Sequence, residues 1–268
     1  MSTGPVQLPG ELAEFYEGIR NVQQQYLEKT GGSQAFKAPV NWVWDGTSPL
    51  INEIMPVFDP APARELFRQL LKLLAVHKQV WAADTEKLAG ITAQDFSVLV
   101  AAAMQGDREG MAGVITRLGV KPEVARFALL LTVKPVLRVF AEKAGPYIDK
   151  ENWMQNYCPV CGNKAGAARV DSTTGRRYLR CAYCQTEWLF RLLCCPSCGN
   201  EDHRSLAYIQ VEETPGYGLH VCEQCKGYLK VIDEQKGGNR ELTANEAATL
   251  YLDVIAQQQG YRNDSINT

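Results

Sequence analysis

Four CxxC pairs restrict the fold of this chain more than any other feature of its sequence. The pairs hold eight of the nine cysteines, and all lie between residues 158 and 225. A CxxC turn brings two sulfurs to one side of a tight loop, so two such turns can surround one metal ion with a tetrahedron of thiolates. The sequence therefore predicts two metal sites, whose ligands are Cys158, Cys161, Cys181, Cys184, Cys195, Cys198, Cys222 and Cys225.

The segments between the pairs predict which turns share an ion. Residues 167–170 and 177–180 flank a turn-like segment, and residues 206–211 and 219–221 repeat this plan, so each stretch is expected to form a β-hairpin. The hairpins separate the turns by 19 and 23 residues, which match or slightly exceed the usual spacing. Consecutive turns should therefore pair, in a tandem repeat of 37 to 41 residues; a cross-braced arrangement is the alternative.

The residue that follows the second cysteine differs between the turns. Gly162 and Gly199 stand there in two CPxCG turns, and glycine tolerates the positive φ that lets backbone amides face the sulfurs. Gln185 and Lys226 stand there in the other two turns, which are therefore predicted to need another local geometry. Cys194 does not stand at CxxC spacing and is interpreted as a buried or spare thiol.

The first 150 residues contain no cysteine and predict a bundle of helices. Apolar side chains recur at helical spacing from Leu12 to Val22 and from Leu66 to His77, and His77 itself is expected to be a core or interface residue. Further helices are predicted near 92–105, 107–118 and 122–145. The proline-rich stretch between the first two helices is more typical of an ordered connector.

The end of the chain predicts one more helix. Thr243 and Glu246 form a capping box that opens a helix to about residue 258. Its apolar face is predicted to consist of Ala247, Leu250, Tyr251 and Val254. The predicted fold is thus multidomain, α with small β, and is divided into an all-helical domain at 1–150, metal modules at 151–191 and 192–240, and a C-terminal helix and tail at 241–268.

Charge and composition argue against several classes of partner. The formal net charge is −2 and the isoelectric point is near 6.0, so bulk electrostatics disfavour nucleic acid and anionic membranes. The N-terminus has no signal-peptide pattern, and Lys134, Pro135 and Arg138 interrupt the longest apolar stretch, so we expect a cytoplasmic protein that does not span a membrane. In a reducing cytosol, clustered CxxC pairs are expected to serve metal or redox chemistry rather than disulfides.

Some polar residues of the cysteine region have two interpretations. His203 and His220 flank cysteines of the second module and are interpreted either as donors to the sulfurs or as turn residues. A local basic patch could dock an acidic partner or a nucleic-acid backbone, or could be a solvated hairpin face. It consists of Lys164, Arg169, Arg176, Arg177 and Arg180.

No pattern of catalytic residues accompanies the cysteines. The sequence contains no glycine-rich phosphate loop, no HExxH and no GxSxG. A complete set of four thiolates also leaves a metal ion no open position for a substrate. These features weigh against metal-dependent hydrolysis at either ion. Zinc and iron both accept four thiolates, so the ligands themselves do not choose between a structural and a redox ion.

The order of these motifs resembles the FdhE family of formate dehydrogenase accessory proteins. The resemblance extends over about 155–267 and depends on CPVCG at 158–162, RRYLRCAYCQTEW at 176–188, CPSCG at 195–199, CEQCKGYLK at 222–230 and QGYRNDSIN at 259–267. It implies a helical N-terminal domain followed by two rubredoxin-like modules of the zinc-ribbon type. It also implies iron, with zinc as the alternative, at two sites formed by the eight paired cysteines.

The resemblance further implies a chaperone-like function that is not enzymatic. A family member would bind the catalytic subunit of a molybdenum or tungsten formate dehydrogenase in the cytoplasm during maturation and assembly, without nucleic acid or membrane as partners. A homodimer is left open. The alternatives are a zinc-ribbon protein that binds nucleic acid and a rubredoxin-like electron-transfer protein, and the weak basic charge disfavours the former.

Overall fold

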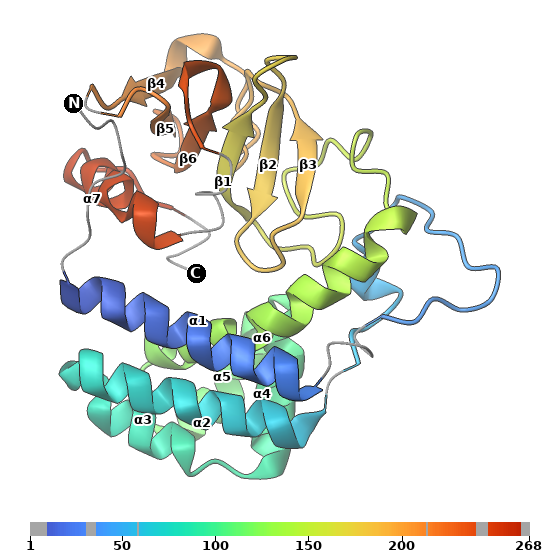
Figure 1. Cartoon of the computed structure of the whole chain (residues 1–268), viewed down its shortest axis with the longest axis vertical. Helices are drawn as coiled ribbons and strands as arrows, with labels where there is room; N and C mark the ends of the chain where they lie inside the picture. The colour runs from blue at the N-terminus through green and yellow to red at the C-terminus, as the bar shows by residue number, and fades with distance from the viewer. Residues whose placement is uncertain (1–9, 31–35, 58, 213, 240–245, 264–268) are drawn as a thin grey trace. The chain divides into compact units, whose positions relative to one another are not determined.

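The computed structural model describes residues 10–30, 36–57, 59–212, 214–239 and 246–263. The chain divides into two compact units, which are described separately (Figure 1). The helical unit comprises Pro9–Tyr147 and Val160–Gly162, and the sheet unit includes Ile148–Pro159 and Asn163–Thr268. The finer boundaries at 150, 191 and 240 stay predictions.

The helical unit confirms the predicted bundle. Its elements are α1 (Gly10–Thr30), η1 (Leu50–Asn52), α2 (Pro60–His77), η2 (Gln79–Trp81), α3 (Ala82–Ala89), α4 (Ala93–Gln105), α5 (Arg108–Leu118), α6 (Pro122–Ala144) and η3 (Gly145–Tyr147). Local signals set the boundaries: Thr92 and Asp107 cap the starts of α4 and α5 by accepting backbone N–H bonds, and these helices end at Gly106 and Gly119 in the left-handed conformation. His77 packs against Phe15 with ring centroids 5.2 Å apart, as expected.

Helix α6 carries much of the core of this unit. Apolar residues such as Leu129, Leu137 and Phe140 are fully buried, and the helix contacts α1 through α5. Pro135 lies inside it and has no N–H, so the carbonyl of Leu131 lacks its usual helical donor. The side chain of Gln23 on α1 supplies that hydrogen bond at 2.7 Å, which ties α1 to α6.

A membrane-spanning helix is not found among the described residues. No single helix there is both long and apolar enough, and Gln79–Ala89 with Ala93–Gln105 meets the length and composition limits only as a pair bent by 117°.

The sheet unit joins both cysteine modules in one six-stranded sheet. The strands are β1 (Ala165–Val170), β2 (Arg177–Cys181), β3 (Glu187–Phe190), β4 (Leu206–Gln210), β5 (Tyr217–Cys222) and β6 (Tyr228–Asp233), in the order β3-β2-β1-β6-β5-β4 (Figure 1). The predicted hairpins correspond to β1–β2 and β4–β5. Each module contributes three strands in the same order, which confirms the tandem repeat.

The two modules meet where β1 and β6 pair in parallel, and all other neighbours are antiparallel. The register runs from Ala167 opposite Lys230 to Val170 opposite Asp233. An unpaired strand edge exposes a row of backbone donors and acceptors. This pairing, which the sequence did not predict, covers one such edge of each module.

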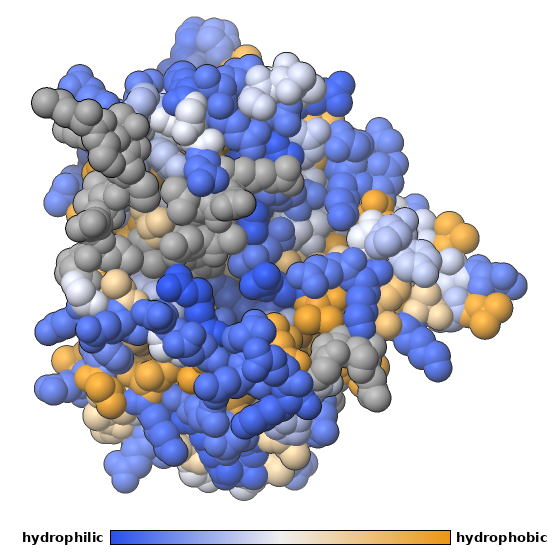
Figure 2. Space-filling model, viewed as in Figure 1, coloured by the Kyte–Doolittle hydropathy of each residue, from blue (hydrophilic) through white to orange (hydrophobic). Residues whose placement is uncertain are grey.

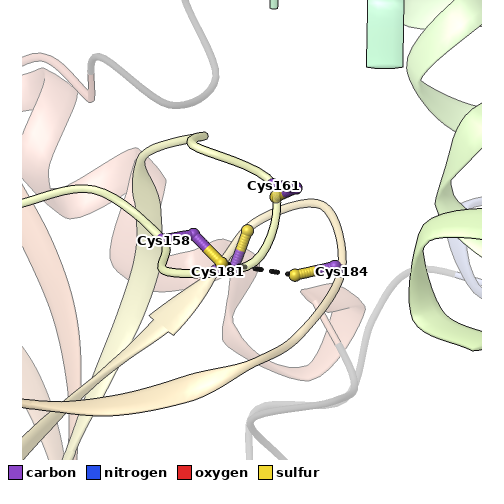
Figure 3. Close-up of side chains that lie close together, drawn as sticks. All are labelled: Cys158, Cys161, Cys181 and Cys184. Carbon is purple, nitrogen blue, oxygen red and sulfur yellow. Dashed lines mark hydrogen bonds between the residues drawn. The ribbon is translucent and has the colours of Figure 1, made fainter. Parts of the chain in front are cut away.

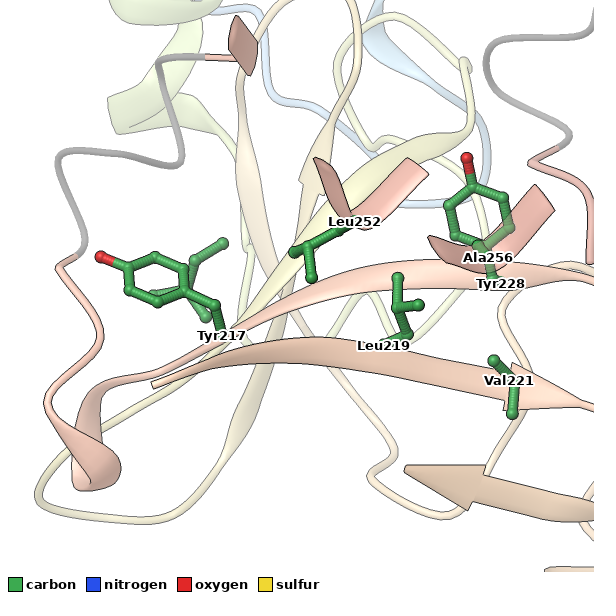
Figure 4. Packing of buried hydrophobic residues seen from close by; sticks show 7 residues of the cluster. Tyr217, Leu219, Val221, Tyr228, Leu252 and Ala256 are labelled. Carbon is green, nitrogen blue, oxygen red and sulfur yellow. The ribbon is translucent and has the colours of Figure 1, made fainter. Parts of the chain in front are cut away.

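The C-terminal helix packs on the second module. Helix α7 (Leu250–Gln258) follows the short η7 (Glu246–Thr249), whereas Thr243 of the predicted capping box lies outside the described residues. The helix and strands β5 and β6 share an apolar cluster (Figure 4), which consists of Tyr217, Leu219, Val221, Tyr228, Ile232, Leu252 and Ala256. The predicted apolar face was wrong in part, because Leu252 and Ala256 are buried while Val254 is 52% exposed.

A buried ion pair explains why the buried face of α7 differs from the apolar face that the sequence predicted. Asp253 accepts hydrogen bonds from Lys230 Nζ at 2.9 Å and from the Tyr228 hydroxyl at 2.8 Å. Both charged side chains are more than nine-tenths buried. A buried charge without its partner is strongly destabilising, so the pair specifies how α7 sits on the sheet.

We expect Asp253→Ala to lower the free energy of unfolding by about 3–5 kcal/mol, because Lys230 would remain as an unpaired buried charge. Urea titration of the purified chain measures this change. The matched control is Glu201→Ala, which removes the exposed pair with Arg191 and should cost less than about 1 kcal/mol. Equal losses in the two variants would contradict a special role for Asp253.

Candidate metal centres

The eight predicted cysteines form two groups of four. Cys158 and Cys161 meet Cys181 and Cys184 in the first group (Figure 3), and the ligand atoms within each group lie within 4.8 Å of one another. The second group consists of Cys195, Cys198, Cys222 and Cys225. Consecutive turns pair, as the hairpins predicted, and the cross-braced alternative is wrong.

The sulfur spacing fits a tetrahedral metal ion. Four thiolates about 2.3 Å from a central zinc ion would lie about 3.8 Å from one another. The Sγ atoms of Cys158 and Cys184 are 3.4 Å apart, and the second group has separations of 3.7 Å and 3.9 Å. A disulfide needs about 2.05 Å. Each group could therefore hold one ion in a sulfur-only shell.

An equivalent backbone hydrogen bond closes each of the four turns. In each turn the N–H of the first cysteine donates to the carbonyl five residues later, at 2.8–2.9 Å. The four acceptors are Asn163, Thr186, Asn200 and Gly227. The repeated bond holds each turn in the same conformation, and this fixes where its two sulfurs lie.

The expectation of another geometry for two of the turns was wrong. The residue after the second cysteine has a positive φ in every turn: 73° and 75° at Gly162 and Gly199, and 63° and 56° at Gln185 and Lys226. A left-handed conformation costs a residue other than glycine roughly 1–2 kcal/mol. The closing hydrogen bond requires a positive φ whichever residue is present. It therefore outweighs the preference of Gln185 and Lys226 for a negative φ.

Side-chain contacts hold Gln185 and Lys226 in this conformation. The Gln185 side chain accepts a hydrogen bond from Arg180 Nη2 at 3.1 Å, and Lys226 forms an ion pair with Glu223. In the fourth turn glycine comes one residue later because of space: a Cβ at Gly227 would lie 3.0 Å from the Cys225 sulfur.

Hydrogen-bond donors surround the sulfurs. Backbone N–H groups reach the sulfurs of Cys181 and Cys225 at 3.3 Å, and Thr186 Oγ1 lies 3.1 Å from that of Cys184. Asn200 Nδ2 donates to the sulfur of Cys222 at 3.5 Å. Thr186 and Asn200 were not predicted from the sequence, although both stand two residues after the second cysteine of a turn, and this repeated position could have identified them.

These donors compete with burial in setting thiol acidity. Burial raises the pKa of Cys195 to about 11 and also raises that of Cys225. At Cys222 burial also acts to raise the pKa, but amide donors from Cys225 and Gln224 together with Asn200 lower it to about 7. A bound divalent cation would favour the thiolate at every position.

The two groups differ in exposure. All four cysteines of the first group are buried, whereas Cys198 is exposed and Cys225 is half-buried in the second. Solvent and competing ligands can therefore reach the second group more easily. Cys194 is buried and belongs to neither group, which agrees with its interpretation as a buried thiol.

Most of the predicted basic patch forms contacts within the fold. Arg169 and Arg180 both form ion pairs with Glu187, at 2.8 Å and 3.1 Å, and Arg169 also contacts Asp171 and Glu234. Arg177 is buried. Three of the five cations are thus used inside the fold, where carboxylates of both modules and backbone carbonyls surround them.

The structure places the two histidines in different environments. His203 is an exposed residue of η4 (His203–Ser205). His220 belongs to β5 rather than to a turn, and its Nδ1 lies 3.1 Å from Arg177 Nη1. Burial, assisted by the charges of Arg177 and Lys236, lowers the pKa of His220 to about 3, so the neutral ring accepts this bond. This hydrogen bond of His220 is thus with an arginine and not with a sulfur.

We expect Gly199→Ala to destabilise the sheet unit by about 1–2 kcal/mol, because alanine disfavours the φ of 75° found there. No atom would lie within 4 Å of the added Cβ, so the effect is one of backbone conformation alone. Gly199→Asn is the matched control, since asparagine accepts this conformation more readily. Urea unfolding at equal metal content should rank the stabilities as glycine, then asparagine, then alanine; no loss in either variant would contradict the closed-turn argument.

Comparison with known proteins assigns the cysteine region to a family. The model described as "FdhE, central domain" matches residues 157–191, and "FdhE, C-terminal domain" matches residues 193–268. "Protein FdhE homolog" from Aquifex aeolicus is 36% identical over 146 residues, which are 53% of this chain and 51% of that protein. "Protein FdhE" from Salmonella paratyphi A is 36% identical over 116 residues, 42% of this chain and 37% of that protein.

The matched segments thus span about half or less of these relatives. The crystal structure of the FdhE protein from Pseudomonas aeruginosa superposes with a TM-score of 0.56 at 22% identity, covering 92% of this chain and 85% of that one, and so shares its fold. The described part of the closing motif, residues 259–263, joins the fourth turn through a bond from Tyr228 N–H to the Arg262 carbonyl. The two matched domains hold all eight paired cysteines, so the cysteine region of the chain is similar to the central and C-terminal domains of the FdhE family.

Proposed function

We propose that this protein is an accessory factor that binds the catalytic subunit of formate dehydrogenase in the cytoplasm during maturation and assembly. The observation that carries the proposal is the pair of complete four-sulfur groups within the two domains that match FdhE. The relatives' name supports a connection to formate dehydrogenase.

The donor sets support a role without catalysis. Four cysteine sulfurs around one ion fill a tetrahedral shell, so no position is left to activate water or polarise a substrate. When bound, the ions would supply folding free energy to small hairpin modules, because ligands on separate turns are brought together only in the folded chain. We propose that Cys158, Cys161, Cys181, Cys184, Cys195, Cys198, Cys222 and Cys225 are the ligands.

We propose iron as the ion, with zinc as the alternative. Both accept four thiolates. The family resemblance supports iron, and backbone N–H donors to the sulfurs suit a negatively charged iron or zinc centre equally well. Zinc has a filled d shell and no redox chemistry, so visible absorption that bleaches on reduction distinguishes the two.

The structure weakens the nucleic-acid alternative. A nucleic-acid surface needs exposed cations that can reach phosphates. Arg169 and Arg180 are occupied by Glu187, and Arg177 is buried, so the local basic patch offers little charge to a backbone.

We expect anaerobically purified protein to carry two metal ions per chain. Cys181→Ser and Cys222→Ser should each reduce the content to about one, because each removes a quarter of one sulfur shell. Cys194→Ser is the control at a cysteine outside both groups and should retain two. Elemental analysis of folded protein gives the readout, and a metal content near zero in the wild type would overturn the assignment. The ion in the more exposed second group should also leave first when a chelator is added.

We expect affinity-tagged protein to retain the formate dehydrogenase catalytic subunit when isolated anaerobically from cells in which that subunit lacks its cofactor. An unrelated bait with the same tag is the control, and mass spectrometry identifies the captured chain. A bait that carries both metal ions but repeatedly captures no catalytic subunit would exclude the proposed partner. This result is independent of the metal analysis, so the proposed metal sites and the proposed partner are tested separately.

A further inference from the structure

The sheet unit contains a mostly apolar cavity of about 260 Å³ in the second module. Its walls come from β4, β5, the start of β6 and the connection at 192–197 that leads into the third CxxC turn. Cys195 and Cys222 form part of the wall, so the cavity borders the second cysteine group directly. Drug-sized ligands occupy cavities of about 300–1,000 Å³, so this smaller volume suits a single side chain.

The internal repeat shows which residue holds the equivalent position in the first module. A row of three side chains crosses the strands of each module, because residues directly opposite each other in an antiparallel ladder share a face. The rows are Ala168, Leu179 and Trp188 in the first module and Tyr208, His220 and Leu229 in the second. Trp188 and Leu229 also each stand four residues after the second cysteine of a turn, so they are equivalent.

The tryptophan and the leucine fill different amounts of space. Trp188 is fully buried, whereas the smaller side chain of Leu229 lines the cavity. Tyr208 replaces the smaller Ala168 in the same row, but its hydroxyl is buried against Gly218. The second module therefore leaves open the space in which the first module holds an indole ring.

The segment that covers this position also differs between the modules. The carbonyl of Gln155, three residues before the first cysteine of its module, accepts a hydrogen bond from Trp188 Nε1 at 2.8 Å. In the second module Leu192 and Leu193 replace the polar pair Gln155 and Asn156, and both leucines line the cavity. An apolar pair thus stands beside the open cavity, where the module with the buried indole has a polar pair.

The two leucines are exposed to solvent. Leu192 is 49% and Leu193 is 63% exposed, and Leu193 is the most exposed large hydrophobic side chain among the described residues of the sheet unit. By contrast, the face of this unit drawn in Figure 2 is mostly hydrophilic. Neighbouring exposed apolar residues beside a pocket are typical of a protein interaction site, in which a buried aromatic side chain often supplies most of the binding energy.

We propose that this cavity binds a tryptophan side chain of a partner protein, in the place that Trp188 occupies in the first module. The indole N–H of the partner donates to the Leu192 carbonyl, as Trp188 donates to the Gln155 carbonyl, and Leu193 packs against the partner's chain. The identity of this partner as the formate dehydrogenase catalytic subunit rests on the proposed function. The preference of the cavity for an indole does not.

The first test titrates the full chain, loaded with diamagnetic zinc, with N-acetyltryptophanamide and follows the leucine methyl signals by NMR. We expect saturable shifts of the Leu193 and Leu229 signals. Binding should be at least about fivefold tighter than that of N-acetylleucinamide, because an indole covers more of the apolar wall. No saturable shift in the folded wild type, or equal binding of the two amides, rules the proposal out.

Variants that copy the first module locate the site. Leu229→Trp fills the cavity from within and should weaken N-acetyltryptophanamide binding at least about tenfold. Leu192→Gln combined with Leu193→Asn restores the polar pair, should weaken binding about fivefold, and decides the question if the tryptophan variant does not fold. Val254→Asn, at an exposed residue outside the cavity, is the matched control and should bind like the wild type. Wild-type binding by both folded variants contradicts the proposal.

Capture of the catalytic subunit separates this inference from the proposed function. The double variant should capture about tenfold less subunit than the wild type and Val254→Asn do, which would support both. If the wild type captures no subunit, the proposed function fails and the amide titration alone decides what the cavity binds. If the double variant captures as much subunit as the wild type, the cavity is not its docking site, and this inference fails while the proposed function stands.

Discussion

The conformation of the closed CxxC turn is the constraint on which the rest of the sheet unit depends. A single N–H bond across five residues recurs in four turns and forces a left-handed residue after each second cysteine. Two such turns at the ends of a hairpin bring four sulfurs together. The strands between the turns can then be short, because their ends are already held. Apolar residues are buried in both modules: Leu179 and Trp188 in the first, and the cluster beneath α7 in the second.

The two modules are joined by more than the β1–β6 pairing. Arg169 of the first module forms a salt bridge to Glu234, which follows β6. Arg177 of β2 reaches the carbonyl of Cys194, which directly precedes the first ligand of the second group. The position of the second group therefore depends on a side chain from the first module. The second module therefore needs the first module beside it to hold its cysteine group in place.

Much of this architecture was predictable because its signals are local. The cysteine spacing, the hairpins and the helices from 92 to 144 follow from patterns within short windows, and the structure confirms them. The parallel pairing of β1 with β6 was not predictable, since it joins residues about 60 positions apart with no sequence signature. Arg177 was misjudged, and Asp253 was not identified, for a related reason: the sequence does not show the buried partner of a charged residue.

The second module is related to the first by a translation across the sheet and not by a rotation. The two edge strands of the sheet therefore differ from each other. The outer strands, β3 and β4, are equivalents of β6 and β1, the two strand types that already pair at the centre. Successive copies could therefore stack head to tail without closing, as heterologous contacts do when they build filaments. The four-residue length of β3 and the backbone bond from Leu189 to Lys150 work against such growth, since they leave little of that edge available to a neighbour.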